Sequence, residues 1–284
     1  MKSLAELVPT LPGPVRSVLR NAVWTIGTAT ARLRPLPDFL ILGAQKAGTT
    51  ALYAYLRRHP GVTGPRWKEV SYFDRHYARG PAWYRGNFPL RWGLIVGEAS
   101  PSYLFHPAAP GRAAALVPEA RLIAILRDPV ERAYSHYQHE VAFGREPLSF
   151  EEALEQEEAR MEGELDRMLA DARYFSHAWW NFTYLARGLY AQQLERWQAA
   201  FGREQLLVLA NEELSAEPAA TYARVLEFLG APPHELEDYP RVFDREYPDL
   251  DPATRERLAG YFAEPNRRLY ELLGHDLAWT KLAG

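Results

Sequence analysis

The chain has 284 residues, and 47% of them are hydrophobic, which is enough for the core of one α/β domain with insertions. Its formal net charge of −3 argues against nucleic-acid binding through bulk electrostatics. The sequence contains no cysteine, which excludes disulfides, thiolate metal sites and a cysteine nucleophile and is compatible with a reducing cytoplasm.

Residues 1–36 are predicted to form an N-terminal leader before a single domain at residues 37–284. The leader lacks the apolar core and cleavage site of a signal peptide, and no stretch reaches the roughly 18 apolar residues of a membrane span. Residues 15–34 combine apolar helical spacing with arginines. A helix packed on the domain, or a frayed tail, is favoured over peripheral membrane contact. The expected location is the cytoplasm, with contact of residues 15–34 with a membrane as the alternative.

An apolar run at residues 39–42 leads into a loop with Gly43, Lys46 and Gly48, and a helical pattern follows. Glycines let the backbone turn sharply and come close to an anion, and the free N–H groups of the helix start point into such a loop. The glycine spacing is that of a P-loop, but Thr49 stands where nucleoside triphosphatases keep their lysine. The pattern predicts a phosphate-binding cradle.

Three further apolar runs are predicted as strands, at residues 94–96, 122–126 and 206–209. Helical patterns alternate with them, which predicts a P-loop-like three-layer α/β/α fold with a central parallel sheet. The predicted helices cover residues 50–58, 130–143, 150–170, 185–201, 218–229 and 252–273.

Loops at residues 59–65 and 79–93 are rich in Pro, Gly and aromatic residues. They lie where loops after parallel strands form a ligand crevice, so they indicate a substrate cleft or simply packing of loops onto the core. The acidic stretch at residues 151–172 predicts a solvated helix. His136 and His139 lie one helical turn apart without a zinc-binding pattern, so no metal site is expected.

A second strand-to-helix passage carries Arg127 at the end of the predicted strand and Ser135 two turns into the next helix. Both side chains can face one crevice. An arginine provides a guanidinium fork, and together with the hydroxyl it suits a second phosphate group.

Together the two motifs resemble the sulfotransferases that use 3′-phosphoadenosine 5′-phosphosulfate (PAPS). One motif of that family holds the 5′-phosphosulfate and the other holds the 3′-phosphate. The motif order resembles the heparan sulfate N-deacetylase/N-sulfotransferase and 3-O-sulfotransferase branch and its bacterial relatives over roughly residues 37–280. The matching segments are residues 68–74 (KEVSYFD), Trp83-Tyr84 before Phe88-Pro89, residues 98–103 (EASPSY), Gly188-Leu189-Tyr190 with Trp197, and residues 261–266 (YFAEPN).

The resemblance implies a role for each matching residue. Lys46 would contact the sulfate and the bridging oxygen, and Glu69 would be the catalytic base. Arg127 and Ser135 would hold the 3′-phosphate, and Arg245 corresponds to a late arginine of the family's cofactor-binding loop. The other cofactor-binding residues that the family implies are Ala47, Gly48, Thr49, Thr50 and Tyr190.

The sequence departs from the family pattern at three points. PAPS is still the expected cofactor, but the identity of the acceptor can no longer be inferred from the family. Ala99 stands where several animal heparan enzymes have a lysine, and Phe243-Asp244 replaces a Lys-Gly pair before the late arginine. The family's common disulfide cannot form. A glycan acceptor is favoured by the resemblance, while a glycolipid, a lipid head group or a small molecule is compatible with the aromatic loops.

Sulfuryl transfer, like phosphoryl transfer, passes through a loose transition state, so positioning and electrostatic stabilisation dominate. A sulfuryl group carries less charge than a phosphoryl group. Lys46 and the loop N–H groups could therefore neutralise the leaving phosphate oxygen, and the expected reaction requires no metal.

The acceptor must lose a proton as it attacks, and Glu69 is the first candidate to accept it. Glu98, at the end of a predicted strand, and His136 are the other candidate bases. The competing structural interpretation is that Glu69 forms a surface ion pair with Lys68 or Arg66.

Two other functions remain open from the sequence. A P-loop kinase that uses ATP or GTP would explain the glycine loop, but it would require magnesium and an aspartate after an apolar strand. A noncatalytic module that binds a nucleotide or a glycan would explain both phosphate motifs without turnover.

Overall fold

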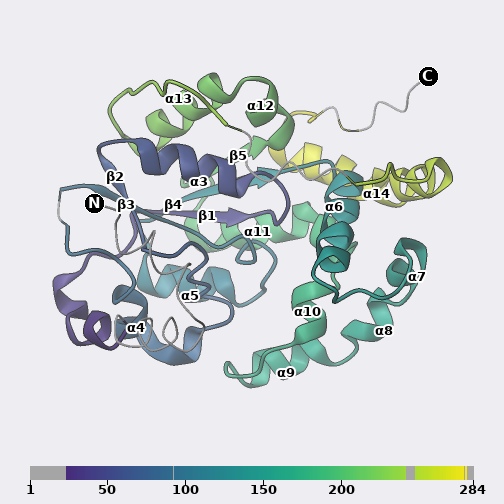
Figure 1. Cartoon of the computed structure of the whole chain (residues 1–284), viewed down its shortest axis with the longest axis horizontal. Helices are drawn as coiled ribbons and strands as arrows, with labels where there is room; N and C mark the ends of the chain where they lie inside the picture. Colours follow the sequence, from purple (N-terminus) through teal and green to yellow (C-terminus); the bar gives the residue numbers. More distant parts are fainter. Residues whose placement is uncertain (1–23, 92, 241–246, 278, 280–284) are drawn as a thin grey trace.

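The fold is a three-layer α/β/α arrangement around one parallel sheet (Figure 1). The computed structural model describes residues 24–91, 93–240, 247–277 and 279. Its strand order is β2-β3-β1-β4-β5, and every neighbouring pair is parallel. The predicted fold class is confirmed. The strands are β1 (Phe39–Gly43), β2 (Val62–Thr63), β3 (Ile95–Ala99), β4 (Arg121–Leu126) and β5 (Leu206–Ala210).

Central strands of this sheet are buried on both faces, which explains why they read as continuous apolar runs. All five residues of β1 are buried, and all but the first residue of β4 are. Only glycine fits at position 97 of β3, because the ring of Phe39 on β1 fills the adjacent space and a Cβ at Gly97 would lie 1.8 Å from Phe39 Cζ.

Helices cover both faces of the sheet (Figure 1). One layer contains α3 (Thr49–Arg58), α12 (Asn211–Ala216) and α13 (Pro218–Leu229). The other contains α5 (Ala109–Leu116) and α11 (Tyr190–Phe201). η3 (Tyr77–Arg79) and α4 (Gly80–Arg85) pack against each other in the long connection before β3.

A second group of helices lies beside the carboxyl ends of β1 and β4 (Figure 1). A separate hydrophobic cluster holds it together, with Tyr134, Phe150, Tyr184 and Phe262 among its buried members. The group comprises α6 (Pro129–Ala142), α7 (Phe150–Glu155), α8 (Glu157–Met161), α9 (Glu164–Ala170), α10 (His177–Asn181), η4 (Ala186–Gly188) and α14 (Pro252–Leu273).

The prediction of one long acidic helix at residues 150–170 is wrong, because the segment forms three short helices, α7, α8 and α9. Gly163 adopts a positive φ of 69° between α8 and α9, a conformation that ends a helix. The segment is also not simply solvated. Glu157 is buried, and its carboxylate accepts hydrogen bonds from the N–H groups of Leu185 and Ala186 at 2.7 and 2.9 Å.

Other boundaries also differ from the expectation. The helix predicted at 185–201 is η4 followed by α11, with Leu189 in a nonhelical conformation between them. The sequence pattern missed β2, α4, α5, α10 and α12, which span two to eight residues each and give little periodicity.

The described part of the predicted leader packs on the domain. Residues 24–29 are helical and η2 (Ala31–Leu33) follows. The Trp24 ring lies 6.5 Å from that of Trp67 and 5.9 Å from that of Trp83. Among the described residues no helix is long and apolar enough to cross a bilayer. The division at residue 36 stays a prediction, and residues 15–23 of the proposed membrane helix lie outside the described residues.

Candidate active site

The loop between β1 and α3 forms the predicted cradle. Gly48 is the residue before α3 and has a φ of 89°, and Lys46 has a φ of 70°. Gly43 leaves room for a neighbouring turn, because a Cβ there would lie 2.6 Å from the carbonyl oxygen of Pro101. The N–H of Ala51 already donates to the carbonyl oxygen of Gly48 at 3.0 Å. The N–H groups of the two residues before it, which begin α3, are in the position that binds an anion at a helix start.

Two side chains from other strand ends fix this loop. The Asn211 amide, directly after β5, donates to the carbonyl oxygen of Ala47 at 3.2 Å. Arg127 Nη1, directly after β4, donates to the carbonyl oxygen of Lys46 at 3.4 Å. Sequence reasoning missed Asn211, although a polar residue at the carboxyl end of a parallel strand is the signal that could have found it.

The second motif is built at the start of α6. Asp128 caps the helix, because its Oδ1 accepts from the N–H groups of Val130 and Glu131 at 2.8 and 3.2 Å. Arg127 precedes this cap, and its Nη2 lies 3.5 Å from Glu131 Oε2. Ser135 follows two turns into the helix. The Arg127 guanidinium therefore contacts both the Glu131 carboxylate and the carbonyl oxygen of Lys46.

Tyr190 contacts the backbone of Arg127 from the protein interior. Its side chain is buried, and its hydroxyl donates to the carbonyl oxygen of Arg127 at 2.9 Å. Burial raises the pKa of the Tyr190 hydroxyl, so it remains a donor. The geometry indicates that Tyr190 positions Arg127.

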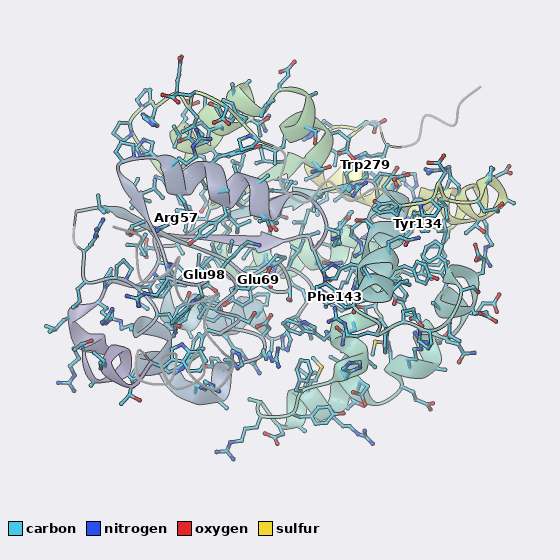
Figure 2. All side chains as sticks on the ribbon, viewed as in Figure 1. Arg57, Glu69, Glu98, Tyr134, Phe143 and Trp279 are labelled. Atoms are coloured by element: carbon cyan, nitrogen blue, oxygen red, sulfur yellow. The ribbon has the colours of Figure 1, made fainter. Side chains whose placement is uncertain are left out.

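Glu69 lies in the turn after Lys68 and has a φ of 63°. Its N–H donates to the carbonyl oxygen of Ala99 at 3.2 Å, which holds the turn against the end of β3. Lys68 Nζ donates to both Glu69 Oε1, at 3.1 Å, and Thr50 Oγ1, at 2.9 Å. The ion pair with Lys68 that the competing structural interpretation named is therefore present, and it lies against the cradle. In the view of Figure 2, Glu69 lies between Arg57 and Phe143.

The two other candidate bases are buried. Glu98 is inaccessible to solvent, and its carboxylate accepts hydrogen bonds from the hydroxyls of Tyr84, Ser100 and Tyr103. Burial raises the pKa of Glu98 despite those three donors. His136 is also fully buried, and burial holds its pKa well below the ordinary value. Neither side chain lines the cavity described next.

One cavity of about 780 Å³ joins the cradle, the second motif and Glu69. Of the expected site residues, its lining contains Lys46, Gly48, Thr49, Thr50, Glu69, Arg127 and Ser135. Two others are absent from the lining: Ala47, which is buried in the loop, and Tyr190. Arg245 lies outside the described residues.

Further side chains of the lining were not singled out from the sequence. Some come from the end of α6 and the turn after it, and others from α10 and the chain after α13. Their signal is weak, because each is an ordinary polar or aromatic residue outside the residues that define the two motifs. They include Gln138, Phe143, Arg145, Trp180, Asn181 and Tyr239.

No group of three or more carboxylate or histidine side chains within the described part of the chain is placed to hold a metal ion. Asp128, the aspartate that follows an apolar strand, uses Oδ1 as the cap of α6. The lack of a metal requirement stays a prediction.

The fold is that of a P-loop-like α/β protein, and the cradle, the second cationic motif and the cavity form a candidate site for an anionic ligand of nucleotide size. The family model described as a sulfotransferase domain matches residues 36–246, which is more than half of the chain. The chain therefore belongs to the sulfotransferase family, which confirms the family resemblance expected from the sequence.

Individual relatives agree with this assignment. The human bifunctional heparan sulfate N-deacetylase/N-sulfotransferase 3 is 34% identical over 84% of this chain, but this chain spans only 30% of that relative. The human heparan sulfate glucosamine 3-O-sulfotransferase 3B1 is 29% identical over 96% of this chain and 70% of the relative. The structure of a sulfotransferase from Alicyclobacillus acidocaldarius superposes with a TM-score of 0.72, at 33% identity over 87% of this chain and all of that chain.

Proposed function

We propose that this chain transfers the sulfuryl group of PAPS to a hydroxyl or amine of a glycan. The single observation that carries the proposal is the common cavity, which brings Lys46, Glu69, Arg127 and Ser135 together from three separate segments of the chain. Relatives that act on heparan sulfate support a glycan as the acceptor class.

The cofactor would bind across the carboxyl ends of β1 and β4. Lys46 and the first N–H groups of α3 would hold the 5′-phosphosulfate, and Arg127 with Ser135 would hold the 3′-phosphate. Tyr190 would act indirectly, through the carbonyl of Arg127.

In the reaction, the acceptor oxygen or nitrogen attacks sulfur while the bond between sulfur and the 5′-phosphate oxygen breaks. Glu69 accepts the acceptor's proton, and 3′-phosphoadenosine 5′-phosphate leaves with the bond electrons. Lys46 stabilises the charge that develops on the leaving oxygen. Lys68 holds the Glu69 carboxylate beside Thr50 before the acceptor arrives.

Calorimetric titration with 3′-phosphoadenosine 5′-phosphate in the absence of metal tests the cofactor assignment. Arg127→Ala removes charge-assisted hydrogen bonds, so the affinity should fall roughly 10- to 100-fold. Arg203→Ala is the control, because Arg203 is exposed and donates to the carbonyl of Leu273 away from the cavity. Tighter binding of ATP with magnesium would contradict the proposal and favour a kinase.

Transfer from labelled PAPS to glycan acceptors tests the base. Glu69→Gln should leave the affinity for the bisphosphate nearly intact and lower kcat by roughly 10²- to 10⁴-fold. Lys68→Met breaks the same ion pair but keeps the carboxylate, so at saturating PAPS its kcat should fall much less. Equal losses in both variants would show that the ion pair matters and would remove Glu69 as the base.

A further inference from the structure

A second cavity, of about 590 Å³, lies at the β2 edge of the molecule. The first described residues, the end of α3 and the turn after α4 meet there, on the Arg57 side of the view in Figure 2. No residue lines both this cavity and the site described above. The same loop contributes to both linings, because Arg66 and Trp67 line this cavity and Lys68 and Glu69 line the other.

The charge of this second cavity is entirely positive. Its lining contains Arg34, Arg57, Arg66 and Arg91 and no acidic residue. Among the described residues, none of these four arginines forms an ion pair with a carboxylate. Burial and the neighbouring charge of Arg66 lower the pKa of Arg34. The two arginines therefore repel each other in the cavity. An anionic group entering the cavity would relieve this repulsion.

The rim of the cavity is apolar and exposed, which is unusual beside so many cations. Ile26 lines the cavity and is 61% exposed, and Leu90, between two lining residues, is 53% exposed. The rings of Trp24 and Trp67 lie in the lining. Tryptophan and arginine beside exposed aliphatic side chains are the combination that favours the interface of an anionic membrane.

We propose that this surface, the Arg34–Arg57–Arg66–Arg91 cavity with its Ile26 and Leu90 rim, binds the phosphate of an anionic phospholipid at a membrane surface. The arginines would hold the head group while the two aliphatic side chains enter the acyl boundary. A free phosphate would use the arginines but would leave the exposed rim without a partner. The sequence indicated membrane contact through residues 15–34 only. The proposed head-group site also includes residues of α3 and of the loops that follow α3 and α4.

Vesicle cosedimentation of the full chain, without PAPS or acceptor, tests the proposal independently of catalysis. The chain should bind vesicles that contain phosphatidylglycerol, should bind pure phosphatidylcholine vesicles poorly, and should be released by high salt. Arg66→Gln with Arg91→Gln should weaken binding roughly 30-fold, since each removes one cation near the anionic surface. Ile26→Ser with Leu90→Ser should weaken it roughly tenfold or more.

Matched double variants distinguish a site from general charge and apolarity. Arg173→Gln with Arg257→Gln removes two exposed arginines elsewhere, and Leu165→Ser with Leu169→Ser removes two exposed leucines of α9; both should bind like the parent. Equal loss in these controls, equal binding to neutral vesicles, or no vesicle binding would overturn the proposal. Inorganic phosphate or heparin binding that needs Arg66 and Arg91, without vesicle binding, would overturn it as well and assign the cavity to a small anion or a glycan.

Discussion

Asp74 is a buried carboxyl group whose titration should be visible in the stability of the whole fold. It is 5% exposed, and its Oδ1 accepts from the N–H of Arg75 at 2.6 Å. Within the described part of the chain, its Oδ2 has no hydrogen-bond partner. Burial raises its pKa to about 7, and the nearby Glu98 adds to the shift while the Arg75 N–H opposes it. The ionised form is thus costly in the folded protein.

The size and sign of the effect follow from linkage. Well below pH 3.8, the ordinary pKa of an aspartate, the Asp74 carboxyl is protonated in both the folded and the unfolded chain, so its favourable contribution is fully present. As the pH rises to 7 the unfolded chain ionises first, and the folded protein loses stability. A shift of about three pKa units at 1.36 kcal/mol each corresponds to about 4 kcal/mol lost between pH 4 and 8.

Urea unfolding of the parent protein and of Asp74→Asn at several pH values measures this loss. Asn keeps the acceptor for the Arg75 N–H but cannot ionise. The free energy of unfolding of the variant, relative to that of the parent, should therefore increase as the pH rises from 4 to 8. Other titrating groups are common to both proteins and cancel in the difference. Asp166→Asn, at an exposed position of α9, is the control and should run parallel to the parent. If the free energy of unfolding of Asp74→Asn also changes with pH in parallel with that of the parent, the reasoning is refuted.

Two further predictions concern the second motif. Asp128→Ala removes the cap that accepts from the N–H groups of Val130 and Glu131, so the free energy of urea unfolding should fall by about 1 kcal/mol; an unchanged value would show that water replaces the cap. Tyr190→Phe removes the hydrogen bond to the carbonyl of Arg127 and should lower stability by about 1 kcal/mol, with only a few-fold loss of bisphosphate affinity by calorimetry. A loss of affinity as large as that of Arg127→Ala would mean that Tyr190 contacts the ligand directly.

Local patterns were sufficient to predict the cradle. Gly43, Lys46 and Gly48 sit between an apolar strand and a helix, and the whole unit depends on backbone preferences of neighbouring residues. Two helices of the C-terminal half, residues 218–229 and 252–273, were predicted with the bounds of α13 and α14 because their periodicity spans several turns.

The roles of individual acids and of the supporting residues depended on contacts between distant segments. Glu98 and Glu69 were both candidate bases from the sequence, but three hydroxyl donors enclose Glu98 while Glu69 lines the cavity. Asn211 and Tyr190 reach the motifs only because β4, β5 and α11 pack side by side.

The parallel α/β layout, the glycine loop and the family resemblance follow from the sequence alone, because strand hydrophobicity, glycine conformation and short motifs are properties of neighbouring residues. Which charged groups share a cavity and which are enclosed depends on how distant segments pack. The same is true of the arginine-lined surface at the β2 edge, whose arginines are separated by as many as 57 positions, from Arg34 to Arg91, and meet only when α3, α4 and the first described residues pack together.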